Sequence, residues 1–398
     1  MKFKDEIQIP ASKSITNRLL IINYLYPNLK LNNISSAKDS VVLERALNTL
    51  LKDENQQISI NIGHAGTAMR FLTALCAIQV GKTIVLDGSE RMRQRPIKIL
   101  VDALNDLGAD ITYLKEIGFP PIKINGKKLK NNSISINSST SSQYITALML
   151  IAPKLQNGLH INLTGEPVSM PYIEMTISLL KSLGIQVEKY DKGFKIFSIN
   201  QIDDKFIEIE GDWSSASYLF GISAVLQRTL ILKNFAKKSY QGDSKIVDYF
   251  TELGIETNFL QDNKILLKPI SNFINPKLIA LNLLETPDLA QTLATTCLAL
   301  KIPCKLTGLQ TLKIKETDRL QALKNEIEKF NIPVKITGSS IEFDDFSNFN
   351  TSNISIKTYD DHRMAMSFAI LKAKYPEITI ENPDVVVKSF PYFWELFY

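Results

Sequence analysis

The chain has 398 residues, of which 44% are hydrophobic and 22% are charged, and its formal net charge is +5. This length exceeds one ordinary hydrophobic core and predicts two domains, while the composition is that of a globular protein. The basic residues are few and scattered, which argues against the dense basic patch of a nucleic-acid-binding protein. The longest apolar runs fall far short of a membrane span, so no membrane association is expected.

Cysteine usage and the first residues bear on the redox compartment. The three cysteines are an odd, sparse set, and Cys76 and Cys297 lie in apolar stretches. Buried free thiols are therefore expected rather than a disulfide or a metal site. The opening MKFKDEIQIP contains no apolar signal region, which favours a cytoplasmic protein.

Six times along the chain, a short polar or small-residue step leads into an apolar helical stretch. The predicted openings are Ser14, Thr67, Ser142, Ser215, Asp288 and His362. From Ser142 onward they lie 73 or 74 residues apart. Self-similarity at one long period indicates a repeated supersecondary unit. Short strands rich in Ile and Val alternate with the helices, so the sequence predicts an α/β fold of six units in two groups of three, with a break near residues 210–212.

The first helix start combines polar and cationic side chains. The segment PASKSITNR holds Lys13 and Arg18, and Ser12 and Ser14 are N-cap candidates. Helix N-termini expose unpaired backbone N–H groups that suit anions. For this segment alone, a capped helix with surface charges is an equally good interpretation.

A Gly-rich step precedes the second helix. In GHAGTAMR, Gly63 and Gly66 allow close backbone approach, Thr67 is the expected cap, and Arg70 is expected in the first turn. An Arg there opposes the helix dipole, and a bound anion would relieve that conflict. The run ERMRQRP follows, and arginines of this kind bind phosphate or carboxylate in a bidentate manner. A solvated loop explains Arg91 and Arg93 better than Arg95.

The third helix start is rich in hydroxyl groups. Residues 138–144, SSTSSQY, supply hydroxyls and an amide, which bind phosphate oxygens or sugar-like hydroxyls. A helix cap alone does not need five polar residues.

Charged residues mark two later segments. KIKETDRLQAL predicts Lys315, Glu316 and Arg319 in the first turn of a helix, where cations are disfavoured unless an anion binds. TYDDHRMAM adds His362 and Arg363 beside two aspartates. The alternative for each segment is a charged, exposed helix start. Lys388 follows as a late cation before an aromatic terminal helix.

Together these segments resemble the enolpyruvyl transferase family, and within it the branch whose acceptor is 3-phosphoshikimate. The motifs SKSxTNR, AGTAMR, RMRQRP, SSQYxTAL, GDxSSASY, KETDRL and DHRMAM occur in the family's order along nearly the whole chain. The resemblance implies two similar domains, each of three βαβαββ units, in an inside-out α/β barrel-like arrangement with the active site in the interdomain cleft. It implies one domain of residues 1–11 plus 211–398 and another of residues 12–210.

The implied reaction transfers the enolpyruvyl group of phosphoenolpyruvate to the 5-hydroxyl of 3-phosphoshikimate and releases phosphate, through a tetrahedral intermediate. It belongs to the shikimate pathway toward chorismate and the aromatic amino acids. Both substrates are anions, which accounts for cations at the helix starts. The resemblance further implies no metal or other cofactor, no nucleic-acid or membrane partner, a monomer, and inhibition by glyphosate-type compounds.

The resemblance also implies roles for single residues. The 3-phosphoshikimate contacts fall on Lys13, Ser14, Arg18, Ser141, Ser142, Gln143, Ser169, Tyr172, Asp288 and Lys315. The phosphoenolpyruvate contacts fall on Lys13, Gly66, Arg95, Gln143, Arg319, His362, Arg363 and Lys388. Asp288 matches the general base for the 5-hydroxyl proton, Glu316 matches the residue that protonates the methylene carbon, and Lys13 borders the reacting groups. An acid and a base in one site need different environments.

Some positions depart from the family pattern, and two other functions compete. His64 and Thr311 each stand where the family often has Asn, so neither enters the assigned site. The sister enzyme that acts on UDP-N-acetylglucosamine typically has a cysteine in the loop matching residues 89–95, and this loop has none. An RNA-binding protein with a similar repeat is the other alternative, but Asp288 and Glu316 would repel a polyanion.

Overall fold

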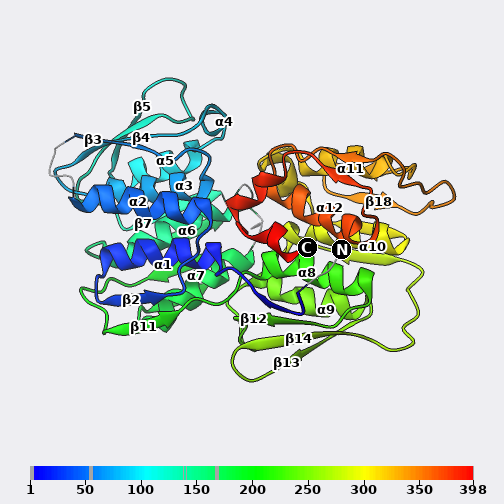
Figure 1. Ribbon diagram of the computed structural model, residues 1–398. Coiled ribbons are helices and arrows are strands. Elements are labelled where there is room, and N and C mark those ends of the chain that lie inside the picture. The colour runs from blue at the N-terminus through cyan, green and yellow to red at the C-terminus, as the bar shows by residue number, and fades with distance from the viewer. Residues whose placement is uncertain (1–3, 53–56, 138, 140, 166–169, 398) are drawn as a thin grey trace. The chain divides into compact units, whose positions relative to one another are not determined.

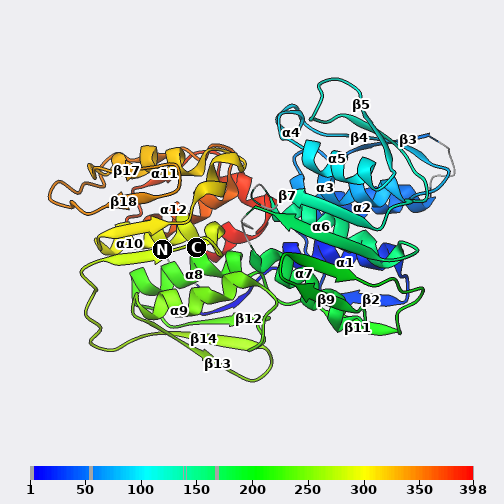
Figure 2. The ribbon, with the colours of Figure 1, turned by 180° about the vertical axis from the view of Figure 1, so that it is seen from behind.

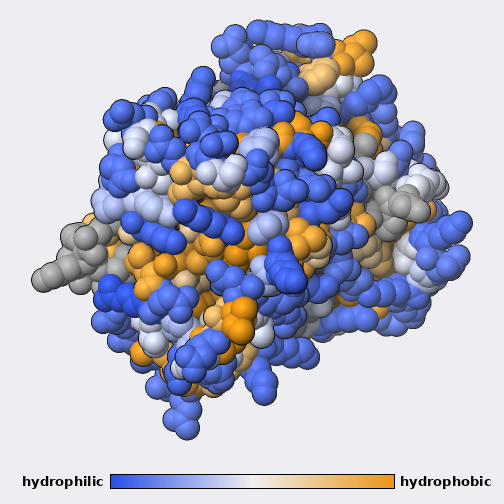
Figure 3. Space-filling view, turned by 90° about the vertical axis from the view of Figure 1, so that its right-hand side faces the viewer, coloured by the Kyte–Doolittle hydropathy of each residue, from blue (hydrophilic) through white to orange (hydrophobic). Residues whose placement is uncertain are grey.

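The computed structural model describes residues 4–52, 57–137, 139, 141–165 and 170–397 (Figure 1). The chain divides into two compact units. We call residues 13–209 the continuous unit, and residues 1–12 with 210–398 the split unit. Within the described residues no helix is both long enough and apolar enough to cross a membrane. Hydrophilic side chains cover most of the face drawn in Figure 3, and hydrophobic ones gather across its middle.

The continuous unit alternates helices and strands along the chain. Its elements are α1 (Lys13–Leu25), β2 (Leu29–Asn32), α2 (Lys38–Lys52), β3 (Gln57–Asn61), α3 (Gly66–Ala77), β4 (Thr83–Asp87), α4 (Glu90–Arg93), α5 (Lys98–Asp106), β5 (Asp110–Tyr113), β6 (Ile122–Asn125), β7 (Ser133–Asn137), α6 (Ser142–Ile151), η1 (Ala152–Lys154), β8 (Leu159–Thr164), α7 (Met170–Ser182), β9 (Val187–Tyr190), β10 (Gly193–Ile196) and β11 (Lys205–Glu208).

The split unit begins with an N-terminal strand and resumes after the continuous unit. Its elements are β1 (Glu6–Gln8), α8 (Trp213–Leu226), β12 (Leu230–Lys233), η2 (Gly242–Lys245), α9 (Ile246–Thr251), β13 (Ile255–Phe259), β14 (Lys264–Pro269), β15 (Ile279–Asn282), η3 (Pro287–Leu289), α10 (Ala290–Leu300), β16 (Cys304–Thr307), η4 (Gln310–Ile314), α11 (Arg319–Glu328), β17 (Lys335–Ile336), β18 (Ile341–Phe343), β19 (Ser355–Ile356), α12 (His362–Lys374), β20 (Thr379–Ile380), η5 (Pro383–Lys388) and η6 (Phe393–Leu396).

Each unit repeats one sheet topology. The continuous unit contains sheets of order β3-β4-β6-β5 and β7-β8-β10-β9, and the split unit contains β1-β12-β14-β13 and β15-β16-β18-β17. In all four sheets a parallel pair is followed by an antiparallel hairpin; Figure 2 shows β13 and β14 beside β12. A further parallel pair, β11-β2 or β19-β20, completes the described strands of each unit. The strand and helix order β-α-β-α-β-β therefore recurs, as the long sequence period predicted.

The second helix of four repeats ends in the same way. Just beyond α5, α7, α9 and α11, the backbone turns left-handed at Gly108 (φ 99°), Gly184 (φ 81°), Gly254 (φ 83°) and Asn331 (φ 59°). Glycine and asparagine tolerate this conformation, which ends a helix by bending the chain back toward the last turn. The same kind of left-handed residue thus ends the second helix in all four repeats.

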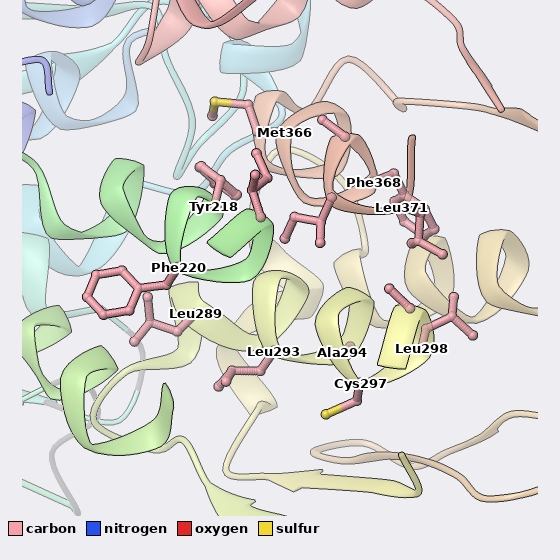
Figure 4. Packing of buried hydrophobic residues seen from close by; sticks show 14 of the residues in the cluster. Tyr218, Phe220, Leu289, Leu293, Ala294, Cys297, Leu298, Met366, Phe368 and Leu371 are labelled. Atoms are coloured by element: carbon pink, nitrogen blue, oxygen red, sulfur yellow. The ribbon is translucent and has the colours of Figure 1, made fainter. Parts of the chain in front are cut away.

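Three buried helices form the centre of each unit. In the split unit, α8, α10 and α12 contribute side chains such as Phe220, Leu293 and Phe368 to one buried hydrophobic core (Figure 4). Helix α8 is buried along nearly its whole length. At Gly221 an added Cβ would lie 2.4 Å from Ile370 Cδ1 and 2.8 Å from Thr296 Oγ1, so α8 approaches its neighbours as closely as glycine allows.

We predict that Gly221→Ala destabilises the split unit by about 1–3 kcal/mol, because overpacking the core outweighs the gain of about 1 kcal/mol in helix propensity. Chemical denaturation followed by circular dichroism measures the change. Gly338→Ala is the control, since a Cβ there meets nothing within 4 Å. A Gly221→Ala variant as stable as the control variant would contradict this account of the packing.

Candidate active site

The helix starts of the split unit bring charged side chains together. Arg363, in the first turn of α12, donates from Nη1 to the backbone oxygen of Asp288 at 3.3 Å. Its Nη2 lies 3.1 Å from Asp288 Oδ2 and 3.3 Å from Ser214 Oγ. Asp288 lies in η3 just before α10, and Ser214 lies in the first turn of α8. The starts of all three central helices therefore meet at Arg363.

Arg319 is the most buried cation of this cluster, with 2% of its surface exposed. Its Nε donates to Asp361 Oδ2 at 2.7 Å, Nη1 to Asp288 Oδ1 at 2.9 Å, and Nη2 to Glu316 Oε2 at 2.9 Å. Burying a charge is costly unless it is paired and hydrogen-bonded. Burial lowers the pKa of Arg319, but the three carboxylates outweigh that effect and raise it above its ordinary value.

Asp288 lies among three cations. Besides its contacts with Arg319 and Arg363, its Oδ1 lies 3.5 Å from Lys315 Nζ. Burial raises the pKa of the Asp288 carboxyl, but Arg363, Lys315 and Arg319 together hold it well below its usual range. Asp288 is therefore ionised at neutral pH and can accept a hydrogen bond or a proton from a hydroxyl group.

Glu316 is held by cations from two different segments. Its Oε2 accepts from Arg319, and its Oε1 accepts from Lys388 Nζ at 2.8 Å. Lys388 is the last residue of η5, close to the C-terminus. A carboxylate and an ammonium from segments 72 residues apart thus share one site.

Asp361 links the cluster to the start of α12. It is fully buried, accepts from the Arg363 backbone N–H at 2.8 Å as the N-cap, and also accepts from Arg319. The two residues before it, Tyr359 and Asp360, have φ values of 56° and 53°, which non-glycine residues rarely adopt. His362 is buried beside it, with Nδ1 3.7 Å from Asp361 Oδ1. A strained turn therefore sets the position of Asp361.

In the continuous unit, Arg18 is a buried guanidinium bonded to neutral oxygens. Nη1 donates to the Ser14 backbone oxygen at 2.8 Å, Nη2 to the Tyr172 backbone oxygen at 3.1 Å, and Nε to Thr176 Oγ1 at 2.8 Å. Among the residues that the structure describes, no carboxylate forms an ion pair with it. Burial lowers the pKa of Arg18 to about 10, so it stays charged at neutral pH. It can hold an anion beside Ser14 and Tyr172.

Arg70 connects the Gly-rich step to the arginine loop. Its Nη1 donates to the Gly66 backbone oxygen at 3.1 Å and its Nη2 to the Pro96 oxygen at 3.0 Å. Burial, and then repulsion from Arg95, lower the pKa of Arg70 to about 10. The Arg95 guanidinium lies against Gly66, where an added Cβ would be 2.4 Å from Nη1. Gly66 and Arg95 are therefore immediate neighbours.

The start of α6 supplies the neutral polar groups. Ser141 is the N-cap and accepts from the Gln143 backbone N–H at 3.3 Å, while Ser142 is buried. Gln143 Nε2 donates to Thr67 Oγ1 at 3.3 Å, which joins the starts of α6 and α3. Lys13, at the start of α1, pairs with Asp39 at 3.6 Å. Ser169 lies outside the described residues.

The structure corrects several local expectations. Lys315 and Glu316 lie in the loop between η4 and α11, because Asp318 caps α11 and the helix begins only at Arg319. Thr67 is not a cap: α3 begins at Gly66 after Ala65. Arg70 consequently lies beyond the first turn.

One further local expectation was wrong. Helix α8 is capped by Asp212, which accepts from the Ser215 backbone N–H at 2.8 Å, so the helix begins before Ser215. The C-terminal aromatic segment is helical, as expected, and forms the short 3-10 helix η6.

Some residues of the cluster were not predicted as site residues. Ser214 and Asp243 join it through Arg363, and Asp361 through Arg319. Asp361 had a signal in the sequence, since an Asp directly before a helix start is a frequent N-cap. Asp243 had none, because its segment reaches the cluster only through tertiary packing.

The described part of the chain contains no group of three or more His, Cys, Asp or Glu side chains able to hold a metal ion. Cys76, Cys297 and Cys304 are buried free thiols, as predicted.

Comparison with known proteins gives one consistent family. Residues 24–397 match the family model described as EPSP synthase (3-phosphoshikimate 1-carboxyvinyltransferase). A 3-phosphoshikimate 1-carboxyvinyltransferase of Bacteroides fragilis (strain YCH46) is 42% identical over 396 residues, which cover 99% of this chain and 94% of that protein. One from Sulfurovum sp. (strain NBC37-1) is 34% identical, with 98% and 95% covered.

Solved structures show the same fold. An EPSP synthase from Acinetobacter baumannii superimposes with a TM-score of 0.78, covering 99% of this chain and 95% of that one, at 19% sequence identity. A second structure from that organism gives a TM-score of 0.76. The mixed α/β architecture is therefore shared by these structures.

We predict that Arg319→Met destabilises the protein by about 3–5 kcal/mol at neutral pH, because three carboxylates lose their common cation. The carboxylates then lie close together with one cation fewer, and their mutual repulsion opposes folding while they are ionised. This penalty is present at neutral pH and shrinks as the pH falls and the carboxylates become protonated.

Thermal unfolding between pH 4 and pH 8 measures this effect. Lys324→Met, on the same helix but half-exposed, is the control and is expected to change stability by less than about 1 kcal/mol. A stability loss for Arg319→Met that is equal at every pH would contradict the electrostatic explanation.

Proposed function

The chain belongs to the EPSP synthase family, and from this premise we propose that it transfers the enolpyruvyl group of phosphoenolpyruvate to the 5-hydroxyl of 3-phosphoshikimate. The products are 5-enolpyruvylshikimate 3-phosphate and phosphate, and the reaction is a step of the shikimate pathway toward chorismate and the aromatic amino acids. The observation that carries the proposal is that Lys315, Arg319 and Arg363 lie around the Asp288 carboxylate and keep it ionised. A base surrounded by cations suits a hydroxyl acceptor that reacts with an anionic donor.

We assign the two anionic substrates to the polar and cationic side chains at the helix starts. In this proposal 3-phosphoshikimate contacts Lys13, Ser14, Arg18, Ser141, Ser142, Gln143, Ser169, Tyr172, Asp288 and Lys315. Phosphoenolpyruvate contacts Lys13, Gly66, Arg95, Gln143, Arg319, His362, Arg363 and Lys388. Guanidinium groups held in place by fixed acceptors can bind phosphate or carboxylate with their remaining N–H groups.

Addition begins when the oxygen of the 5-hydroxyl attacks C2 of phosphoenolpyruvate. Asp288 takes the hydroxyl proton in the same step. Glu316 gives a proton to the methylene carbon, which produces the tetrahedral intermediate. Elimination then returns a proton from the new methyl group to the Glu316 carboxylate, restores the carbon–carbon double bond and expels phosphate. Lys13 borders the reacting groups and stabilises the charge that develops.

Glu316 must be protonated to act as the acid. In the structure it accepts hydrogen bonds from Arg319 and Lys388, which favour its ionised form. The anionic groups of phosphoenolpyruvate compete for these same cations. When these cations bind phosphoenolpyruvate instead, the Glu316 carboxylate loses its two charged partners, and the proton-donating form becomes accessible.

The same family membership supports the remaining proposals. We propose two domains, residues 1–11 plus 211–398 and residues 12–210, and the division of the chain into two compact units supports this proposal. We propose that each is an inside-out barrel and that substrates bind in the cleft between them. We also propose a cytoplasmic, monomeric enzyme that glyphosate-type compounds inhibit and that needs no cofactor.

An acceptor assay tests the proposed reaction. Phosphate release from phosphoenolpyruvate is expected with 3-phosphoshikimate and is expected to be absent with UDP-N-acetylglucosamine or with no acceptor. Mass spectrometry identifies the enolpyruvyl product. Release with UDP-N-acetylglucosamine alone would assign the chain to the sister reaction, and no release with either acceptor would refute the proposal.

We predict that Asp288→Asn lowers kcat at least 100-fold, because general base catalysis contributes about 10²–10⁴ to the rate. The amide keeps the size of the side chain, so the Kd of 3-phosphoshikimate should change by less than about fivefold. Steady-state kinetics and calorimetric titration measure the two quantities. A kcat within threefold of the wild-type value would remove Asp288 as the base.

A further inference from the structure

One buried carboxylate of the split unit has no role in the proposed reaction. Asp243 lies in η2 and is 6% exposed. Its Oδ2 accepts a hydrogen bond from Ser214 Oγ, and Ser214 Oγ in turn accepts from Arg363 Nη2 at 3.3 Å. Asp243 is thus one side chain away from a cation assigned to phosphoenolpyruvate.

The segment that carries Asp243 is fixed to the start of α8 by other contacts. Gln241 Oε1 accepts from the Trp213 backbone N–H at 3.1 Å, and Gln241 Nε2 donates to the Gly211 oxygen at 2.8 Å. Glu210 accepts from Ser239 Oγ at 2.9 Å. These bonds hold the two segments together without Asp243, so structural support alone does not require a buried charge at this position.

A carboxylate at Asp243 decides which way the Ser214 hydroxyl points. An ionised carboxylate can only accept, so the Ser214 proton is directed to Asp243. The oxygen lone pairs of Ser214 then face Arg363 Nη2, which also donates to Asp288 Oδ2 at 3.1 Å. Two acceptors in fixed positions hold one edge of the Arg363 guanidinium.

We propose that Asp243 is a positioning residue that acts through Ser214 to orient Arg363 for phosphoenolpyruvate. This inference rests on the proposed function. An amide at position 243 can present its NH₂ group to Ser214, which reverses the hydroxyl and points its proton at the cation. Asp243 thus directs a hydrogen bond without touching either substrate.

The protonation of Asp243 gives a second readout. The charged groups that face it are Asp288, Arg363 and Asp212. Burial, and then repulsion from Asp288, raise the pKa of Asp243 to about 6. Below that pH the wild-type protein loses the ionised acceptor and comes to resemble an Asn variant.

The experiment compares Asp243→Asn and Ser214→Ala with Ser217→Ala as a matched control. Ser217 lies on the same helix, is buried, and bonds to Thr292 at 2.8 Å. At pH 7.5 the first two variants are expected to raise the KM for phosphoenolpyruvate about tenfold, the effect of one hydrogen bond to a charged group. The KM for 3-phosphoshikimate should stay within twofold, and the control should match the wild type in both constants.

The pH series separates positioning from simple structural damage. The ratio of the variant KM to the wild-type KM for phosphoenolpyruvate should fall toward one below pH 6 for Asp243→Asn. A phosphoenolpyruvate KM that is unchanged, or that rises equally with the 3-phosphoshikimate KM and at every pH, would overturn the inference alone. A wild-type protein without turnover would instead refute the proposed function, and this inference with it.

Discussion

A guanidinium removed from water needs acceptors on every side, and this constraint organises both compact units. In the split unit the acceptors are charged, because Arg319 forms ion pairs with the carboxylates of Asp288, Glu316 and Asp361. In the continuous unit the acceptors are neutral, because Arg18 donates to two backbone carbonyls and two threonine hydroxyls. A positive charge held by neutral groups is only partly compensated, so it favours binding of an anion.

The repeated fold explains why these cations gather at helix starts. Helices α8, α10 and α12 of the split unit and α3 and α6 of the continuous unit are buried along most of their length, so most of their side chains pack in the core. Polar and charged groups can be accommodated only where a helix begins. There the backbone N–H groups and the helix dipole add to the attraction for negative charge. The groups that bind anions are therefore expected at the starts of the central helices.

Much of this arrangement could be predicted from the sequence. The long period gave six helix starts, and each lies within two residues of a helix in the structure. The motifs that carry Lys13, Arg95, Glu316 and Arg363 led to the correct family. Local patterns were sufficient here because a helix start depends on a few neighbouring residues.

Contacts across the fold could not be predicted in the same way. Nothing near Asp243 in the sequence indicates that it reaches Arg363 through Ser214, because packing of η2 against α8 creates that contact. Lys315 and Glu316 were expected within a helix, but the competing cap at Asp318 shifts the helix start and leaves both in a loop. Side-chain networks and the choice between neighbouring caps depend on tertiary structure, which periodicity does not encode.

The most direct measurement is the calorimetric affinity of 3-phosphoshikimate for Arg18→Met beside Arg91→Met, an exposed arginine of the same unit. If the Arg18 guanidinium is the anion-binding group, its loss should raise the Kd on the order of 100-fold, since a buried charge partner is removed. The unfolding temperature should fall little, because only neutral groups lose their donor. An Arg18→Met protein that binds 3-phosphoshikimate as tightly as the Arg91→Met protein would contradict the account.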